Sequence, residues 1–219
     1  MDIVLALIDF ILHIDAHLAE LIGDYGVWIY GILFAIIFVE TGLVVMPFLP
    51  GDSLLFVAGA FAAKGDMDLG LVIVLLSVAA ILGDALNYSV GRYFGAKVFA
   101  WEDSRWFNKR LFDKTHAFYE KHGGKTIVIA RFLPFLRTFA PFVAGAAKMT
   151  YPRFALYNVS GGIFWVASLT IAGYLFGNIP WVSKNLTLII VAMIIIPGLP
   201  TVYVVVREWL AGRRARRGG

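Results

Sequence analysis

The stretch from residue 40 to residue 60, ETGLVVMPFLPGDSLLFVAGA, constrains the fold of this chain more than any other. It is almost entirely apolar, yet it carries the carboxylates Glu40 and Asp52 and the prolines Pro47 and Pro50. Ionisable groups inside apolar segments are costly, and they usually have a partner or a task. Prolines remove helical hydrogen bonds, which a membrane tolerates only where protein or a wet cavity satisfies the freed carbonyls. The stretch is therefore a candidate binding site.

The composition of the chain is that of a membrane protein. Hydrophobic residues make up 60% of the 219 residues and charged residues only 16%, which is unlike a soluble globular domain. Four apolar runs approach or exceed the ~20 residues that span a bilayer, and they cover 25–46, 70–91, 154–177 and 186–206. The sequence therefore predicts an all-α polytopic integral membrane protein. Because the chain has no cysteine, disulfides, zinc thiolate sites and cysteine nucleophiles are excluded.

Two short sequence motifs each occur twice in the chain. FLP is found at 48–50 and 132–134, an offset of 132 − 48 = 84 residues, and FVAGA at 56–60 and 142–146, an offset of 142 − 56 = 86. The chain therefore consists of two related halves. We expect repeat one over 25–95 and repeat two over 126–180.

Each half contains an apolar piece that is interrupted by proline and too short to cross a bilayer. Residues 53–63, for example, make about 16 Å of helix, roughly half the hydrocarbon thickness. We prefer a re-entrant hairpin to a kinked spanning helix, and expect one at about 42–63 and another at about 126–148. A transmembrane helix follows each hairpin, at 70–95 and 154–177. The expected breaks lie at Pro47, Pro50, Gly51, Pro134 and Pro141.

The remaining segments flank the two repeats. Residues 1–24 are predicted to form an interfacial amphipathic helix. His13 and His17 are four apart on this helix, but its polar face needs such residues in any case, so no metal site is expected. Basic and aromatic residues in the linker 96–125 favour contact with lipid head groups rather than nucleic acid. An extra span at 186–206 and a basic tail at 207–219 complete the chain.

The basic residues are distributed unequally between the predicted loops. Of 19 Lys and Arg residues, 14 lie in 97–125, at Lys148 and Arg153, and from Arg207 onward. The positive-inside rule then places the linker 96–125 and the C-terminus in the cytoplasm. A single span, 70–95, separates the two hairpins, so they enter from opposite faces, as in inverted-repeat transporters.

Two pairs of charges lie near the expected breaks. On one continuous helix, Glu40 and Asp52 would point ~120° apart, and so would Arg131 and Arg137. Only a chain folded at the prolines brings each pair to a common point. Arginine binds phosphate bidentately, and a buried carboxylate near arginine can exchange a proton as solvent access alternates. The alternative is a buried salt-bridge cluster that only locks the hairpins together.

A polar stripe follows the predicted span 70–95. It consists of residues at helical spacing, namely Asp84, Asn87, Tyr88, Gly91 and Arg92. One interpretation is a structural ion pair with Arg92 reaching the interface. The other is a wall of the substrate path, formed by Asp84, Asn87, Tyr88 and Arg92. Both stay open, and residues 154–177 and 186–206 are interpreted as ordinary spans.

At these charged residues the chain resembles the DedA family of bacterial inner-membrane proteins, part of the wider SNARE-associated Golgi (VTT-domain) group. The resemblance covers about 25–206 and depends on ETGLVVMPFLPGD at 40–52, GDALNYSVGR at 83–92 and RFLPFLRTFAPFVAGA at 131–146. It implies an inner-membrane transporter or flippase for a lipid phosphate, notably undecaprenyl phosphate recycling driven by the proton motive force. Its functional pairs would be Glu40 with Asp52, although many members carry Glu in place of this Asp, and Arg131 with Arg137.

Other functions compete with this hypothesis. Glu40 and Asp52 would also serve a proton/cation antiporter, and the family group includes phospholipid scramblase-like proteins. A lipid phosphatase is disfavoured, because no nucleophile–base arrangement is apparent and the four histidines lie outside the breaks. A non-transporting assembly factor would use the charges only structurally. We therefore expect a non-enzyme without cofactor or metal, with lipid phosphate, phospholipids and protons as partners, and a homo-oligomer is compatible with this.

Overall fold

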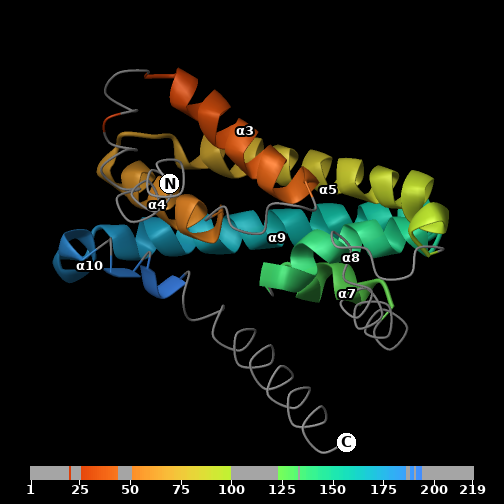
Figure 1. The fold of residues 1–219 in the computed structure, drawn as a ribbon. Helices are drawn as coiled ribbons and strands as arrows, with labels where there is room; N and C mark the ends of the chain where they lie inside the picture. The colour runs from red at the N-terminus through yellow and green to blue at the C-terminus, as the bar shows by residue number, and fades with distance from the viewer. Residues whose placement is uncertain are drawn as a thin grey trace, which may run out of the picture.

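The computed structural model of the protein describes residues 26–43, 51–99, 123–132, 134–185, 188–189 and 191–193, together with Glu20. Within these ranges the regular secondary structure is entirely helical, with no strand. Figure 1 shows the helices side by side as one bundle. In chain order they are α3 (Trp28–Gly42), α4 (Gly51–Lys64), α5 (Leu69–Phe99), α7 (Lys125–Ala130), α8 (Pro134–Ala146), α9 (Tyr151–Gly177) and α10 (Pro180–Lys184).

Two of these helices are long and apolar enough to cross a membrane. They are Leu69–Phe94 within α5, with 26 residues, and Tyr151–Gly177, with 27. At about 1.5 Å per residue each exceeds the ~30 Å of a hydrocarbon core. The structure therefore has a candidate membrane-spanning helix at each of the predicted spans 70–95 and 154–177. The two helices run in opposite directions along the bundle (Figure 1).

The outer surface of α5 is apolar. Exposed large aliphatic residues recur every three or four positions along one face, at Leu71, Val74, Val78, Leu82 and Leu86. Exposed fractions between 43% and 63% along such a stripe would be an aggregation liability in water, and are ordinary where the solvent is lipid. This face of α5 is therefore suited to contact with lipid chains.

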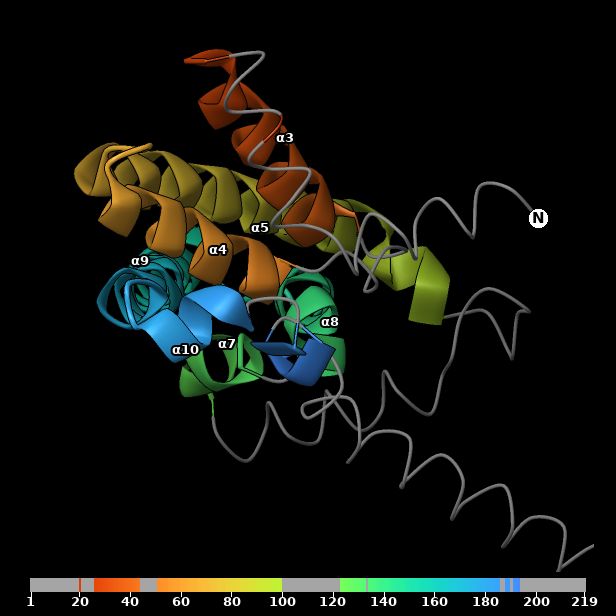
Figure 2. The ribbon, with the colours of Figure 1, turned by 90° about the vertical axis from the view of Figure 1, so that its left-hand side faces the viewer.

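The remaining helices arrange themselves around α5 and α9. α3 lies on one side of the bundle, whereas α7 and α10 lie on the opposite side (Figure 2). α3 has 15 residues, or about 22 Å, so its described part is shorter than a hydrocarbon core. The predicted helix 1–24, Pro47, Pro50, most of the linker 96–125, most of the span 186–206 and the tail 207–219 lie outside the described residues.

The first FVAGA segment lies in α4 and packs against α9. A Cβ atom on Gly59 would collide with the carbonyl of Thr170, and one on Gly173 would collide with the carbonyl of Phe56. The two helices therefore touch through their backbones, which is how small residues drive helix association in membranes. α4 thus belongs to the first half of the chain but packs on the long helix of the second half.

The second FVAGA segment lies in α8 and makes the same contact with α5. A Cβ on Gly145 would collide with the carbonyl of Tyr88, and one on Gly91 with the carbonyl of Phe142. On the FVAGA side the equivalent residues are 86 apart (142 − 56 and 145 − 59), and on the long helices they are 82 apart (173 − 91 and 170 − 88). The short helix of each half therefore packs on the long helix of the other half, and the backbone contacts are equivalent in the two pairs.

Enlarging either buried glycine is expected to destabilise the bundle. Gly59→Val and Gly145→Val each force a side chain into a backbone carbonyl, which we expect to cost about 3 kcal/mol. Thermal unfolding in detergent, followed by the loss of monodisperse protein, measures the effect. Gly31→Val is the matched control, because a Cβ at Gly31 meets no atom within 4 Å. Wild-type melting of both buried variants would contradict the backbone contacts.

Candidate functional site

Arg137 joins the two halves of the chain through two carboxylates. Its Nη1 donates a hydrogen bond to Asp52 Oδ1 at 2.8 Å, and its Nη2 donates to Glu40 Oε1. Glu40 lies near the end of α3, Asp52 in the first turn of α4, and Arg137 in the first turn of α8. We call Glu40, Asp52 and Arg137 the triad. Three helix termini therefore meet at one guanidinium.

The ends of the helices explain why the triad forms. The Glu40 carboxylate lies directly against Gly51, where a Cβ atom would collide with it. Gly51 is the first residue of α4, so the negative charge faces the positive end of the helix dipole. Glu40 is fully buried, and the exposed side-chain fraction is 9% for Arg137 and 27% for Asp52. Asp52 is therefore the triad residue whose side chain is most exposed.

Trp165 of α9 completes this site. Its Nε1–H donates to Asp52 Oδ1 at 3.0 Å, and its ring centroid lies 5.2 Å from Arg137 Cζ. The indole therefore holds both a carboxylate and a guanidinium, the second through a cation–π contact. Sequence reasoning missed this residue by treating 154–177 as an ordinary span. The sequence does contain an indication of its role, which is a tryptophan within an apolar helix. A buried indole N–H needs a hydrogen-bond acceptor.

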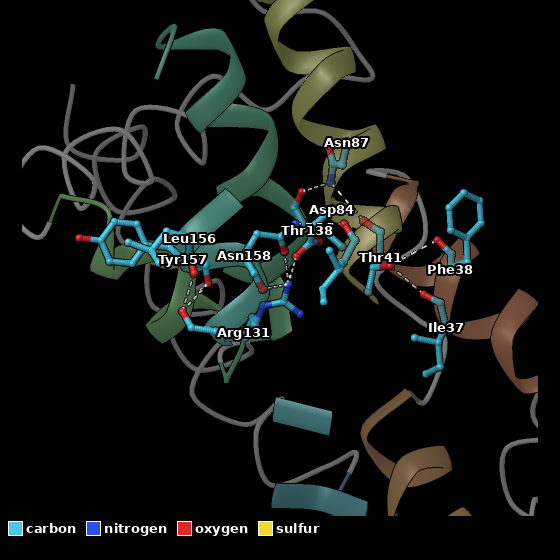
Figure 3. A network of polar contacts seen from close by, with 12 residues as sticks. Ile37, Phe38, Thr41, Asp84, Asn87, Arg131, Thr138, Leu156, Tyr157 and Asn158 are labelled. Carbon is cyan, nitrogen blue, oxygen red and sulfur yellow. Dashed lines mark hydrogen bonds and ion pairs between the residues drawn. The ribbon is translucent and has the colours of Figure 1, made fainter. Parts of the chain in front are cut away.

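Arg131 forms a second, separate cluster (Figure 3). It follows the last residue of α7, and its Nη2 donates to Asp84 Oδ2 of α5 and, at 2.5 Å, to Asn158 Oδ1 of α9. The amide of Asn158 in turn donates to the Ile81 carbonyl at 3.0 Å. All three polar side chains are at most 5% exposed. We call Asp84, Arg131 and Asn158 the Arg131 cluster; it ties α5, α7 and α9 together.

Glycines make room for this second guanidinium. A Cβ on Gly161 would lie 3.3 Å from Arg131 Nε, and one on Gly162 would lie 3.4 Å from its Nη2. The two glycines of α9 thus form a slot for the arginine as well as a surface for helix packing. Asn158 was not among the residues predicted from the sequence, although an amide side chain within an apolar span indicates a polar partner.

The structure does not bring the four predicted charges to one point. Arg137 contacts both Glu40 and Asp52, but among the described residues the carboxylate partner of Arg131 is Asp84. The expectation of a shared contact point for both arginines is therefore wrong in this conformation. Arg131 directly follows the end of α7, whereas Arg137 lies in the first turn of α8, so the two side chains reach different partners.

The predicted polar stripe of α5 divides among several partners. Asn87 donates to the Thr138 carbonyl at 2.8 Å, Tyr88 donates to the Met149 carbonyl, and Arg92 donates to Tyr88 Oη at 3.1 Å. Asp84, Asn87 and Tyr88 are buried by protein, and Arg92 is exposed. The stripe therefore holds α5 against the second half of the chain, and Arg92 reaches the surface.

The predicted breaks have three outcomes. Gly51 begins α4 and Pro134 begins α8. Proline is common at the first position of a helix, where its missing N–H has no helical partner in any case. Pro141 lies inside α8, so a break at this position is wrong. Proline removes one helical donor and crowds the carbonyl four residues earlier, but the packing of α8 on α5 through Gly91 and Gly145 keeps the helix continuous. Pro47, Pro50, His13 and His17 lie outside the described residues.

A cavity of about 510 Å³ lies beside the triad. Asp52 and Trp165 form part of its lining. The other lining residues are Phe132, Leu169 of α9, Trp181 of α10, Leu188, Ile189, Ala192 and Met193. Asp52 is the one charged residue among those that line it. The triad therefore has an open side, whereas the Arg131 cluster is enclosed by helices.

Long antiparallel apolar helices, short helices between them and buried ion pairs at helix ends are typical of a membrane protein with an internal polar site. Residues 49–175 match the family model of the VTT domain. The chain belongs to this family, which is also the DedA family of membrane proteins.

Several relatives are similar over most of their length. The chain is 57% identical over 219 residues to Protein DedA of Escherichia coli K12, covering 99% of this chain and 100% of the relative. It is 47% identical over 165 residues, 75% of this chain and 74% of the other, to an uncharacterized membrane protein of Mycobacterium leprae. It is 38% identical over 152 residues, 69% of each, to the inner membrane protein YqjA of Escherichia coli K12. No solved structure matches the chain.

Removing the partner of Arg131 is expected to destabilise the protein strongly. Asp84→Ala leaves a buried guanidinium without its carboxylate, which costs about 3–5 kcal/mol. The double variant Asp84→Leu/Arg131→Met removes both charges and should recover much of this loss. Thermal unfolding in detergent measures both, with the exposed carboxylate variant Asp66→Ala as the control. A double variant no more stable than Asp84→Ala would argue against the pair.

Proposed function

We propose that this protein moves a lipid phosphate across the membrane and that Arg137 binds the phosphate. The observation that carries the proposal is the sharing of Arg137 between Glu40 and Asp52 beside an open cavity. The guanidinium of Arg137 already binds one carboxylate through each of its two Nη groups. The same two groups have the geometry to bind two oxygens of a phosphate instead. The family resemblance favours undecaprenyl phosphate as the lipid, and hence its recycling.

The charge of the triad couples phosphate binding to protons. Two carboxylates and one guanidinium leave one net negative charge when all three groups are ionised. An anionic phosphate cannot join such a buried site without strong repulsion. Protonation of both carboxylates leaves the positive charge of Arg137 free for the phosphate. In this mechanism protons enter with the lipid on one side of the membrane and are released on the opposite side when the carboxylates recapture Arg137, a movement that a proton motive force would drive.

Arg131 has a positioning role in this proposal. Its guanidinium is held by Asp84 and Asn158 in an enclosed slot, and phosphate would have to break both contacts to reach it. Arg131 therefore keeps α7 against α5 and α9, so that the following turn places Arg137 at the triad. This differs from the equal phosphate-binding roles that the family resemblance implies for the two arginines.

The architecture that we propose is a pair of inverted repeats. The equivalent packing of the two FVAGA helices on opposite long helices supports it, as does the antiparallel course of α5 and α9 (Figure 1). α4 and α7–α8 would be arms of re-entrant hairpins that enter from opposite faces. The excess of basic residues in 97–125 and after residue 206 supports a cytoplasmic position for these segments. The protein would lie in the bacterial inner membrane, without cofactor and without catalysing a reaction.

Substitution of Arg137 is expected to stop lipid movement. In liposomes containing a polyprenyl phosphate, Arg137→Ala should lower its transfer between leaflets at least about tenfold, because charged hydrogen bonds to phosphate are lost. Arg137→Lys should also be impaired, since an ammonium cannot bind bidentately. The matched control is Arg153→Ala, at an exposed arginine of α9. Transfer at the wild-type rate by a folded Arg137→Ala protein would refute the assignment.

Neutralising Glu40 is expected to weaken the pH dependence of phosphate binding. In the wild type, binding should fall as pH rises, because ionised carboxylates compete for Arg137. Glu40→Gln removes one competitor and should bind more tightly at high pH, with a flatter profile. The ligand for this titration is a prenyl methyl phosphodiester, whose single charge stays constant over the range. Parallel profiles for the two proteins would contradict coupling through Glu40.

A proton/cation antiporter is the second candidate. The net negative charge of the triad and the 27% exposure of Asp52 would also suit a cation. Salt-driven proton flux in vesicles that lack polyprenyl phosphate would favour this function over lipid transport. Phospholipid movement that ignores the pH gradient would instead favour a scramblase-like protein.

A further inference from the structure

The cavity beside the triad is amphiphilic. One end holds Asp52, which contacts Arg137 at 2.8 Å. The rest of the lining is apolar and includes Phe132, Leu169 and Ala192. A cavity of about 510 Å³ lies within the ~300–1,000 Å³ range of small-molecule sites. Its volume and the polarity of its lining suit a ligand with one charged end and one hydrocarbon end.

The mouth of the cavity is lined by large exposed aromatic residues. Phe132 is 45% exposed and Trp181 is 63% exposed, and both belong to the lining. α10, which carries Trp181, lies beyond the end of α9 (Figure 1). Exposed aromatic surface at the rim of a pocket marks a place where an apolar partner enters. In a membrane protein such a partner arrives sideways, from the lipid phase.

Trp165 lies at the junction between the polar and apolar ends. Its ring is 1% exposed, donates its N–H to Asp52 and presents its face to Arg137. The same ring lines the cavity. A molecule in the cavity would therefore have its polar group on the triad side of Trp165 and its chain along Leu169 toward the rim.

We propose that this cavity binds the first part of the hydrocarbon chain of the lipid whose phosphate is held by Arg137. The inference rests on the proposed function, and it names the chain-binding site that the triad alone does not provide. Its support is the contact of a charged cluster and an apolar cavity through one residue, Trp165. Each methylene placed in the cavity adds hydrophobic binding energy that the phosphate group cannot supply.

The test measures binding as a function of chain length. Wild-type protein in nanodiscs binds radiolabelled farnesyl phosphate, and the competitors are inorganic phosphate, isopentenyl phosphate and farnesol. We expect farnesyl phosphate to bind at least about tenfold more tightly than isopentenyl phosphate, because more chain is buried. Empty nanodiscs correct for partitioning into lipid.

Two variants fill the cavity without touching the triad. Leu169→Trp and Ala192→Phe place larger side chains in the lining, and both should remove the advantage of the farnesyl chain while leaving the binding of inorganic phosphate, which has no chain, unchanged. Leu175→Trp is the matched control, since Leu175 lies on the same helix, is 63% exposed and is not part of the lining. Leu169 packs against the core, so Leu169→Trp can misfold. Ala192→Phe then still tests the cavity.

The outcomes separate the cavity from the phosphate site. Wild-type farnesyl phosphate binding by two folded filling variants would overturn the cavity proposal. Equal affinity of the wild type for farnesyl and isopentenyl phosphate would overturn it as well, and would indicate that bilayer phospholipid occupies the cavity. If farnesol competes as well as farnesyl phosphate and the filling variants abolish both, the cavity stands and the phosphate role of Arg137 fails.

Discussion

The burial of two guanidinium groups is the constraint on which the rest of this structure depends. A charge in an apolar interior is tolerated only with a partner close by, so each arginine requires carboxylates from elsewhere in the chain. Arg137 obtains them from Glu40 and Asp52, at the ends of α3 and α4, and Arg131 obtains Asp84 from α5. The ion pairs therefore decide which helix termini meet.

Backbone contact between helices makes these ion pairs reachable. α4 lies on α9, and α8 on α5, at distances that only glycine allows. Each short helix is thus supported by the long helix of the other half. A short helix held in this way presents its first turn, with Asp52 or Arg137, toward the centre of the bundle. Movement of either short helix would require the triad to open.

The two arginines consequently differ in what they can do. Arg131 is enclosed by Asp84, Asn158 and two glycines of α9, which suits a fixed structural contact. Arg137 contacts Asp52, a partly exposed carboxylate that lines a cavity, which suits exchange of partners. In the proposed mechanism a lipid phosphate and the carboxylates bind the same guanidinium in turn, and protons decide which of them holds it.

Sequence alone was sufficient for the features that depend on local composition. Apolar length determined the spans at α5 and α9, the Gly51 and Pro134 positions marked the helix starts, and charge within apolar segments singled out Glu40, Asp52 and Arg137. Tertiary structure alone decided that Arg131 pairs with Asp84, that Trp165 completes the triad and that α8 continues through Pro141. Partner choice depends on how helices rotate and cross, and backbone contact at glycines settles that geometry, which no periodicity along the chain encodes.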